Sequence, residues 1–162
     1  MQIRPASPAD VPAVLPMVAK IAALHERWDP AKYGYLPNPA EMYRGWLTSR
    51  ARDRRSVFLV AERDAILTDV PFLVGFLVAT VEREIPIYRL EEYGFIHDLW
   101  VEEEYRHEGF GQQMVMLAVE RFRDLGVRQV RADTAASNGP ARGLMLACGF
   151  RPSTIEMLLE IK

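Results

Sequence analysis

Residues 93–111, which read YGFIHDLWVEEEYRHEGFG, decide the fold. The first part, residues 93–101, is rich in branched and aromatic side chains, which predicts a β-strand. The sequence then changes period, because from Phe110 onward apolar residues recur at helical spacing until Gly126. The stretch therefore predicts a strand, a glycine-containing turn and an amphipathic helix in direct succession.

Side-chain alternation along residues 93–101 gives the predicted strand two distinct faces. One face carries Phe95, His97, Leu99 and Val101, and the other carries Ile96, Asp98 and Trp100. We therefore expect His97 and Asp98 to point to opposite sides of the sheet.

A further strand is predicted at residues 127–132, directly after the helix. A strand, a crossover helix and a second strand form a βαβ unit, whose strands are parallel neighbours in a right-handed crossover. The remaining predicted elements are a strand at residues 3–4, a helix starting at Ser7-Pro8-Ala9-Asp10, a helix at 39–49, a hairpin of strands 56–61 and 71–81 with its turn around Arg63 and Asp64, a helix from Asn138 to Cys148, and a final antiparallel strand at 151–161. The expected fold class is α/β (α+β), with a mixed, mostly antiparallel sheet and helices on both faces.

Composition limits the class of protein. The chain has 162 residues, 20 Lys and Arg against 22 Asp and Glu, and 49% hydrophobic residues, so we interpret residues 1–162 as a single domain. A net charge of −2 with interspersed signs disfavours nucleic acid as a partner. The single cysteine, Cys148, excludes an intrachain disulfide and a cysteine-rich zinc site, and we expect no metal.

The location of the protein is also constrained by the sequence. No uninterrupted apolar run approaches the roughly 18 residues of a membrane span. The first residues, MQIRPASPAD, lack the basic and then apolar layout of a signal peptide. We therefore expect no membrane partner and a cytoplasmic location.

The turn between strand and helix carries the pattern R-x-x-G-x-G, formed by Arg106, Gly109 and Gly111. Two glycines at a helix N-terminus leave main-chain N–H groups uncovered, and these donors together with the helix dipole favour a phosphate or pyrophosphate. Arg106 can add a charge-assisted contact. The glycines also have a purely steric explanation, because a tight turn between a strand and a helix requires them. Neither a dinucleotide fingerprint nor a P-loop fits, since the former needs a glycine at Met114 and the latter a Gly-Lys-Ser/Thr run.

A second motif, N-x-x-A-x-x-L followed by Gly-Phe, lies further along the chain. The residues of both motifs are Val101, Arg106, Gly109, Gly111, Asn138, Ala141, Leu144, Gly149 and Phe150. In their order and separation they resemble the GNAT superfamily of acyl-CoA-dependent N-acyltransferases, over about residues 93–150. The resemblance implies the GNAT fold, in which one parallel strand pair is splayed apart to hold acyl-CoA.

The resemblance implies acetyl-CoA (coenzyme A) as co-substrate. Its pyrophosphate is expected on the turn, and its pantetheine arm is expected to pair with the end of the preceding strand like an added strand. The implied pyrophosphate residues are Arg106, His107, Glu108, Gly109, Phe110, Gly111 and Gln112, and the implied pantetheine residues are Leu99, Trp100 and Val101. Asn138, Ala141 and Met145 complete the implied set. A plain helix cap is an equal alternative for Asn138.

Acyl transfer to an amine requires a neutral nucleophile, donors for the oxyanion and a proton for the departing thiolate. Family members commonly protonate the thiolate with a tyrosine at a position that is Met145 here, and a thioether has no proton to donate. Polyamine-acetylating members have a Glu-Asp pair in the strand before the turn, and the matching pair is His97-Asp98. We interpret His97 as the candidate base and Asp98 as a group that orients the amine, with structural roles as the alternative for both.

In the family that the sequence resembles, the choice of acceptor usually depends on the first two helices, their loop and the hairpin strands. Aromatic and acidic side chains in those segments are Trp28, Tyr33, Tyr35, Tyr43, Trp46, Glu82 and Glu84. Rings and carboxylates attract a protonated amine, so we interpret Trp28, Tyr33, Tyr35 and Glu82 as acceptor-binding. Core packing for Trp46 and a solvated strand end for the glutamates are the simpler alternatives.

The sequence therefore predicts an N-acetyltransferase that moves an acetyl group from acetyl-CoA to a primary amine of a small molecule by direct attack in a ternary complex. The alternatives are a peptide N-terminal or lysine acetyltransferase and a non-catalytic acyl-CoA-binding module. A homodimer is expected only by analogy with similar proteins.

Overall fold

The computed structural model describes residues 2–63 and 72–161, so Asp64 and Pro71 of the predicted hairpin lie outside the described residues. The elements in chain order are β1 (Gln2–Pro5), the 3-10 helix η1 (Pro8–Asp10), α1 (Val11–Trp28), α2 (Pro39–Arg50), β2 (Val57–Arg63), β3 (Phe72–Arg83), β4 (Glu92–Val101), the 3-10 helix η2 (Glu103–Tyr105), α3 (Phe110–Asp124), β5 (Val130–Ala132) and α4 (Gly139–Ala147). Within these ranges no helix is long and apolar enough to cross a membrane.

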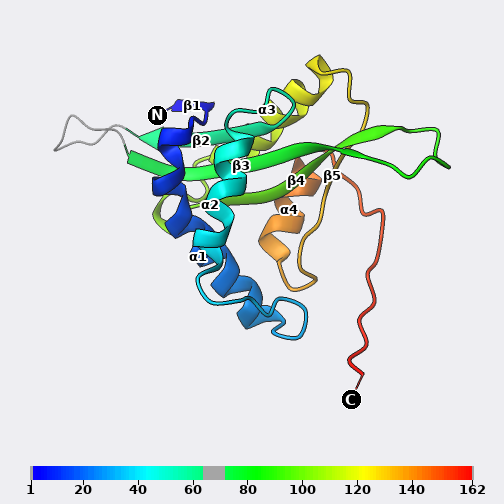
Figure 1. Ribbon diagram of the computed structural model, residues 1–162, viewed down its shortest axis with the longest axis horizontal. Helices are drawn as coiled ribbons and strands as arrows, with labels where there is room; N and C mark the ends of the chain where they lie inside the picture. The colour runs from blue at the N-terminus through cyan, green and yellow to red at the C-terminus, as the bar shows by residue number, and fades with distance from the viewer. Residues whose placement is uncertain (1, 64–71, 162) are drawn as a thin grey trace.

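The strands form one sheet in the order β1-β2-β3-β4-β5. The first four strands pair antiparallel with their neighbours, and β4 pairs parallel with β5. Helices α1 and α2 cover one face of this sheet, and α3 and α4 lie on the other (Figure 1). The predicted mixed sheet with helices on both faces is therefore confirmed.

Alternating strand residues divide the buried side chains into two cores. Phe76 and Val78 of β3 face the core under α1 and α2, whereas Leu77 and Ala79 face the core under α3. In the second core α3 lies so close to β4 that a Cβ atom on Gly94 would stand 2.6 Å from the ring of Phe122. The start of β4 therefore requires glycine where α3 crosses it.

The segment before α1 is held by an ion-pair network. The main-chain N–H and the hydroxyl of Ser7 both donate to Asp10, at 2.7 and 2.8 Å, and Arg4 donates two hydrogen bonds to the same carboxylate. The hydrogen bond from Arg4 is the main reason that the pKa of Asp10 falls to about 2. This network joins β1 to the first turn of the helical segment, as the predicted helix start requires.

A β-bulge in β4 changes which way its side chains point. Val78 pairs with Asp98 but Ala79 pairs with Ile96, so His97 is the extra residue. Asp98 accepts a hydrogen bond from Tyr43, and the His97 ring contacts the Trp46 ring. Tyr43 and Trp46 both belong to α2. The expectation that His97 and Asp98 occupy opposite faces is therefore wrong, because strict alternation does not survive an inserted residue.

The predicted strand at residues 151–161 is also wrong. These residues form no helix or strand, all are exposed, and the segment runs away from the body (Figure 1). Alternating apolar residues can form a strand only beside a partner edge. Within the described residues, residues 151–161 pair with none.

Candidate functional site

The parallel strands β4 and β5 separate partway along β4. Their pairing covers Gly94–Ile96 against Val130–Ala132, and β4 continues alone on this side to Val101. On its other side β4 stays paired with β3 as far as Val101. One side of the last five residues of β4 is therefore left without a strand partner among the described residues, at the place where the family resemblance implies the pantetheine arm.

The turn after β4 presents main-chain donors. Gly109 precedes α3 with φ 88° and His107 has φ 66°, both left-handed values. The first bond of the helix runs from the N–H of Gln113 to the carbonyl of Gly109, at 3.0 Å. Within residues 2–63 and 72–161, no acceptor takes the N–H groups of residues 107–112. These N–H groups and the positive end of the α3 dipole suit an anionic ligand.

The Arg106 side chain contacts residues of the turn and of the end of β4. Its Nε donates to the carbonyl of Val101 at 3.0 Å, and its guanidinium lies 4.9 Å from the centre of the Trp100 ring. It also forms an ion pair with Glu103, while Glu108 pairs with Arg63. The anion-binding capacity of the turn thus rests on its main chain more than on the Arg106 charge.

Helix α4 closes against the start of α3. A Cβ atom on Gly111 would stand 3.2 Å from a methyl carbon of Leu144, so the two helices approach closely there. The Asn138 side chain accepts a hydrogen bond from the N–H of Ala141 at 3.1 Å, which is the helix-cap role. Met145 is half-buried against the core under α3.

The bulge in β4 brings two candidate catalytic residues to the α2 side of the sheet. The Tyr43 hydroxyl donates to Asp98 at 2.8 Å, and the Trp46 ring meets the His97 ring edge-on, with 5.1 Å between centroids. Both side chains are partly buried at the point where β4 leaves β5. The pair therefore lies beside the separated strands.

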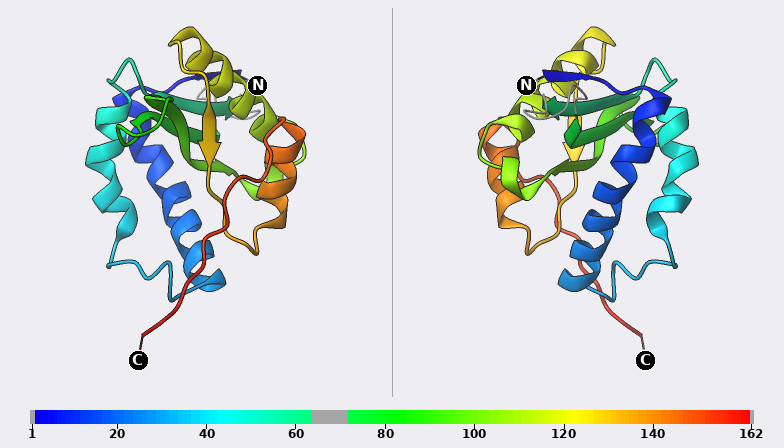
Figure 2. Two further views of the ribbon diagram at one scale, coloured as in Figure 1. Left: turned by 90° about the vertical axis from the view of Figure 1, so that its right-hand side faces the viewer. Right: turned by 90° about the vertical axis from the view of Figure 1, so that its left-hand side faces the viewer.

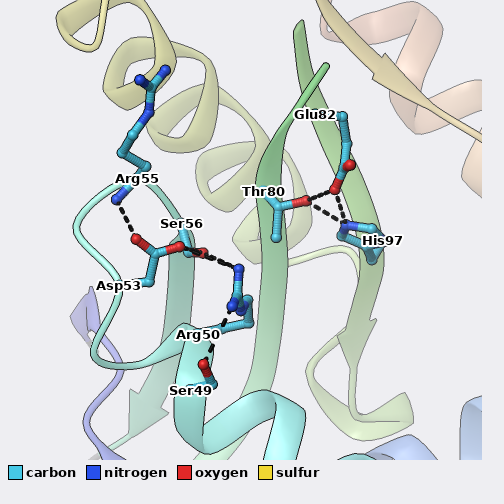
Figure 3. A network of polar contacts seen from close by, with 8 residues as sticks. All are labelled: Ser49, Arg50, Asp53, Arg55, Ser56, Thr80, Glu82 and His97. Carbon is cyan, nitrogen blue, oxygen red and sulfur yellow. Dashed lines mark hydrogen bonds and ion pairs between the residues drawn. The ribbon is translucent and has the colours of Figure 1, made fainter. Parts of the chain in front are cut away.

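His97 belongs to a polar network with Thr80 and Glu82 of β3, shown in Figure 3. The Thr80 hydroxyl donates to Glu82 at 2.6 Å and lies 2.6 Å from Nε2 of His97. A hydroxyl has one proton, and here Glu82 takes it, so the contact with His97 is made by Nε2–H donating to the Thr80 oxygen. The Nδ1 atom of His97 is then the unprotonated ring nitrogen, which can accept a proton.

Burial keeps the imidazole of His97 neutral. It lowers the pKa of His97 from 6.5, and the positive charge of Arg50 acts in the same direction, while Asp98 and Glu82 oppose it. Burial raises the pKa of Asp98, whereas the hydrogen bond from Tyr43 and the positive charges of His97 and His25 lower it by less. A neutral imidazole at physiological pH has the protonation state that a general base requires.

The predicted acceptor residues do not all reach this pair. Burial is the main reason that the pKa of Tyr35 is raised, and the negative charge of Asp98 adds to it. Tyr33 stacks on His25 with 4.7 Å between ring centroids, and the Trp28 ring lies 5.5 Å from the same imidazole, centroid to centroid.

The two predicted glutamates differ in their partners. Glu82 accepts a hydrogen bond from Thr80, and its carboxylate lies 3.7 Å from Nε2 of His97. Glu84 is paired with Arg131, away from the pair.

Thr80 is the site residue that sequence reasoning missed. Its only sequence signal is its place two residues before Glu82, on the same face of β3. The contact with His97 depends on strand register and on the bulge. Within the described ranges no cluster of three or more His, Cys, Asp or Glu side chains could hold a metal ion.

Comparison with known families gives one match. The family model described as acetyltransferase (GNAT) family matches residues 21–150. This range includes the turn with free N–H groups and the Asn138 motif. A search of curated proteins finds no match.

Several solved structures share the fold. A mutant of the BH1408 protein from Bacillus halodurans has a TM-score of 0.85 and 17% identity, covering 100% of both chains. An aminoglycoside antibiotic 6'-N-acetyltransferase from Acinetobacter haemolyticus has a TM-score of 0.69 and 15% identity, covering 100% of this chain and 99% of that chain. A ribosomal-protein-alanine N-acetyltransferase from Brucella melitensis has a TM-score of 0.68 and 15% identity, with 99% and 100% covered. At these identities the likeness concerns the fold.

Proposed function

Because the chain belongs to the GNAT family of acetyltransferases, which implies acyltransferase activity, we propose that it transfers an acetyl group from acetyl-CoA to a primary amine of a small molecule. The observation that carries this proposal is the separation of β4 from β5 after Ile96, next to the free N–H groups that precede α3. Amine and thioester would meet in one complex, by direct attack.

The residues present fit the acyl donor. An extended arm that pairs with the end of β4 would satisfy main-chain groups that β5 leaves free, and the N–H groups of residues 107–112 would hold the diphosphate. Acetyl-CoA supplies the acetyl group as a thioester. The proposed contacts are Leu99, Trp100 and Val101 for the arm, the main chain of residues 106–112 for the diphosphate, and Asn138, Ala141 and Met145 from α4.

His97 is the proposed base. Its Nε2–H is held by Thr80, so Nδ1 is free to take a proton from the amine, directly or through a water. Removal of that proton is necessary because only a neutral amine has a lone pair for attack. Thr80 and Glu82 are therefore positioning residues, which fix the ring and its tautomer.

Asp98 and Tyr43 are the proposed contacts of the acceptor amine beside His97. A carboxylate that accepts a hydrogen bond from a phenol keeps further lone pairs for the N–H groups of an amine. The rings of Tyr35 and Tyr43 add faces that a cation can approach. We propose a small cationic or aromatic amine as the acceptor, with Trp28 and Tyr33 further along the same side.

The departing thiolate receives no proton from Met145, which has none to give. Water is the proposed proton source, and hydrogen bonds from the main chain can stabilise the sulfur before protonation. A tyrosine is thus unnecessary for the reaction, although its absence limits the rate when thiolate departure is slow.

The test is release of free thiol from acetyl-CoA with separate panels of small amines, peptide N-termini and lysine peptides. We expect turnover with small cationic or aromatic amines, and with His97→Ala we expect saturable acetyl-CoA binding with little turnover. Activity only on peptides would reject the proposed acceptor class. Cofactor binding without turnover on any amine would favour the non-catalytic binding module.

A further inference from the structure

Helix α2 lies beside α1 on one face of the sheet (Figure 2). Three of its half-buried side chains, Tyr43, Trp46 and Arg50, follow one another at intervals of three and four residues, so they share one face of the helix. The rings of Tyr43 and Trp46 have 4.7 Å between centroids, and the Arg50 guanidinium lies 5.8 Å from the centroid of the Trp46 ring. Along the helix, Trp46 therefore contacts a ring before it and a cation after it.

Arg50 is held by the end of α2 and the segment that follows it, as Figure 3 shows. Its guanidinium donates to Asp53 at 3.2 Å and to the hydroxyls of Ser49 and Ser56 at 3.2 and 3.3 Å. The Nε atom of Arg50 is buried and has no acceptor among the described residues. A buried donor without an acceptor costs free energy, so the hydrogen bonds alone do not explain this position of the side chain. The attraction of a cation to an indole ring supplies a further reason, which is the contact with Trp46.

The orientation of the His97 ring depends on side-chain contacts. As the inserted residue of the bulge, His97 pairs with no residue of β3. Its ring meets the Phe95 ring within β4 and the Trp46 ring on α2, with 5.0 and 5.1 Å between centroids, and both contacts are edge-on. Its Nε2 atom lies 2.6 Å from the Thr80 hydroxyl. Of these three contacts, Trp46 alone comes from outside the sheet, so α2 limits the movement of the ring through Trp46.

Groups on four elements affect the protonation of His97. Burial is the main reason that the pKa of His97 lies below 6.5, and the charge of Arg50 on α2 acts in the same direction. The charges of Asp98 on β4 and Glu82 on β3 act in the opposite direction. From α1, His25 lowers the pKa of Asp98. The ring of α2 that contacts His97, and the cation on that ring, therefore both favour the neutral imidazole.

We propose that Trp46, held in place by Arg50, is a positioning residue for the base: it keeps the His97 ring against Thr80 and so leaves Nδ1 open to the acceptor amine. The inference rests on the proposed function, because it gives α2 a part in the proton transfer assigned to His97. Trp46 and Arg50 act through His97 and not on the amine itself. If Trp46 served only as core packing, another apolar side chain would serve as well.

Steady-state kinetics with one small amine test the role in catalysis. Trp46→Leu keeps an apolar side chain but removes the ring, so kcat should fall roughly tenfold or more while the KM for acetyl-CoA stays unchanged. Trp46→Phe, which keeps a ring, should restore most of the rate. Leu47→Val is the matched control, because Leu47 is the buried residue of the same helix, and it should lower the unfolding temperature without lowering kcat. Equal kcat in Trp46→Leu and the wild type, or an equal fall in Leu47→Val, would overturn the proposal.

Nuclear magnetic resonance of the histidine rings tests the same role without activity. The chain has three histidines, His25, His97 and His107, so the His97 signals are assigned by their loss in His97→Gln. In the wild type, nitrogen spectra should show the ring proton on Nε2. Trp46→Leu should populate both tautomers and raise the pKa of His97 through lost burial, and Arg50→Met should raise that pKa through the lost positive charge.

The two measurements distinguish failure of the inference from failure of the proposed function. A His97 ring with the same tautomer and pKa in Trp46→Leu as in the wild type would overturn the inference, even where the wild type acetylates amines. A ring that changes in Trp46→Leu, in a protein that acetylates no amine, would support control of the ring by Trp46 and reject the proposed function.

Discussion

Nε2 of His97 lies 2.6 Å from the hydroxyl oxygen of Thr80, and that hydroxyl donates its proton to Glu82. The relationship connects β4 to β3 across the bulge and assigns the proton of a neutral imidazole to Nε2. It therefore determines which nitrogen of His97 can act as a base.

Thr80→Val should lower kcat while leaving the KM for acetyl-CoA unchanged. Valine has nearly the shape of threonine but cannot accept from Nε2–H, so the ring loses its fixed tautomer. Because general bases contribute about 10²–10⁴-fold, we expect a fall in kcat of roughly tenfold or more. Steady-state kinetics measure this, and Thr80→Ser, which keeps the hydroxyl, should restore most of the rate. Equal kcat in Thr80→Val and the wild type would remove Thr80 from the mechanism.

Glu82→Gln should shift the pH profile of kcat/KM. Burial lowers the pKa of His97 from 6.5, and the negative charges of Asp98 and Glu82 act in the opposite direction. The base acts when neutral, so its contribution is lost as the pH falls through the pKa of His97. A glutamine still accepts from Thr80 but has no charge, so the acid limb should move to lower pH. One acceptor amine is used throughout, so its own ionisation is common to both profiles. An unmoved limb would mean that another group controls it.

Much of the fold follows from periodicity and caps. The apolar spacing after Phe110 predicts α3, and its closure by Gly126 fits the end of α3 at Asp124. The βαβ rule predicts the parallel pairing of β4 with β5 before any contact is known. These features are local or governed by general chain handedness, which is why sequence suffices for them.

The features that sequence could not provide depend on register or on distant partners. The bulge at His97 requires knowledge of how β3 and β4 align, and it reverses the expected side of one catalytic candidate. The role of Thr80 follows from the same alignment. The strand predicted at residues 151–161 is not formed, because a strand needs a partner edge and these residues pair with none of the described residues.

Asp10→Asn should destabilise the domain, most strongly at neutral pH. The hydrogen bond from Arg4 holds the pKa of Asp10 near 2, below the ordinary 3.8, so the stabilisation is complete above about 3.8 and is lost as the pH falls through about 2. Allowing for partial exposure of Arg4, we expect a loss of about 1–2 kcal/mol at pH 7. Urea unfolding at pH 7 and at pH 2.5 measures the difference between variant and wild type. If that difference is as large at pH 2.5 as at pH 7, the ion pair is not its source.

Gly109→Val should weaken acetyl-CoA binding. The control variant Gly126→Val should lose a similar amount of fold stability and keep its affinity for acetyl-CoA. Gly109 has φ 88°, and a Cβ there would lie 3.4 Å from the side-chain nitrogen of Gln113, so a valine would strain the left-handed backbone of the turn and add bulk beside its N–H groups. Gly126 ends the same helical segment with φ 79° and has nothing within 4 Å of a Cβ position, so Gly126→Val carries a similar backbone strain away from the proposed diphosphate site. Titration calorimetry with acetyl-CoA should show an affinity loss of roughly tenfold or more for Gly109→Val, from the lost N–H contacts, and little change for Gly126→Val. Thermal unfolding should show similar destabilisation of both variants. Equal affinities in the two variants would place the diphosphate elsewhere.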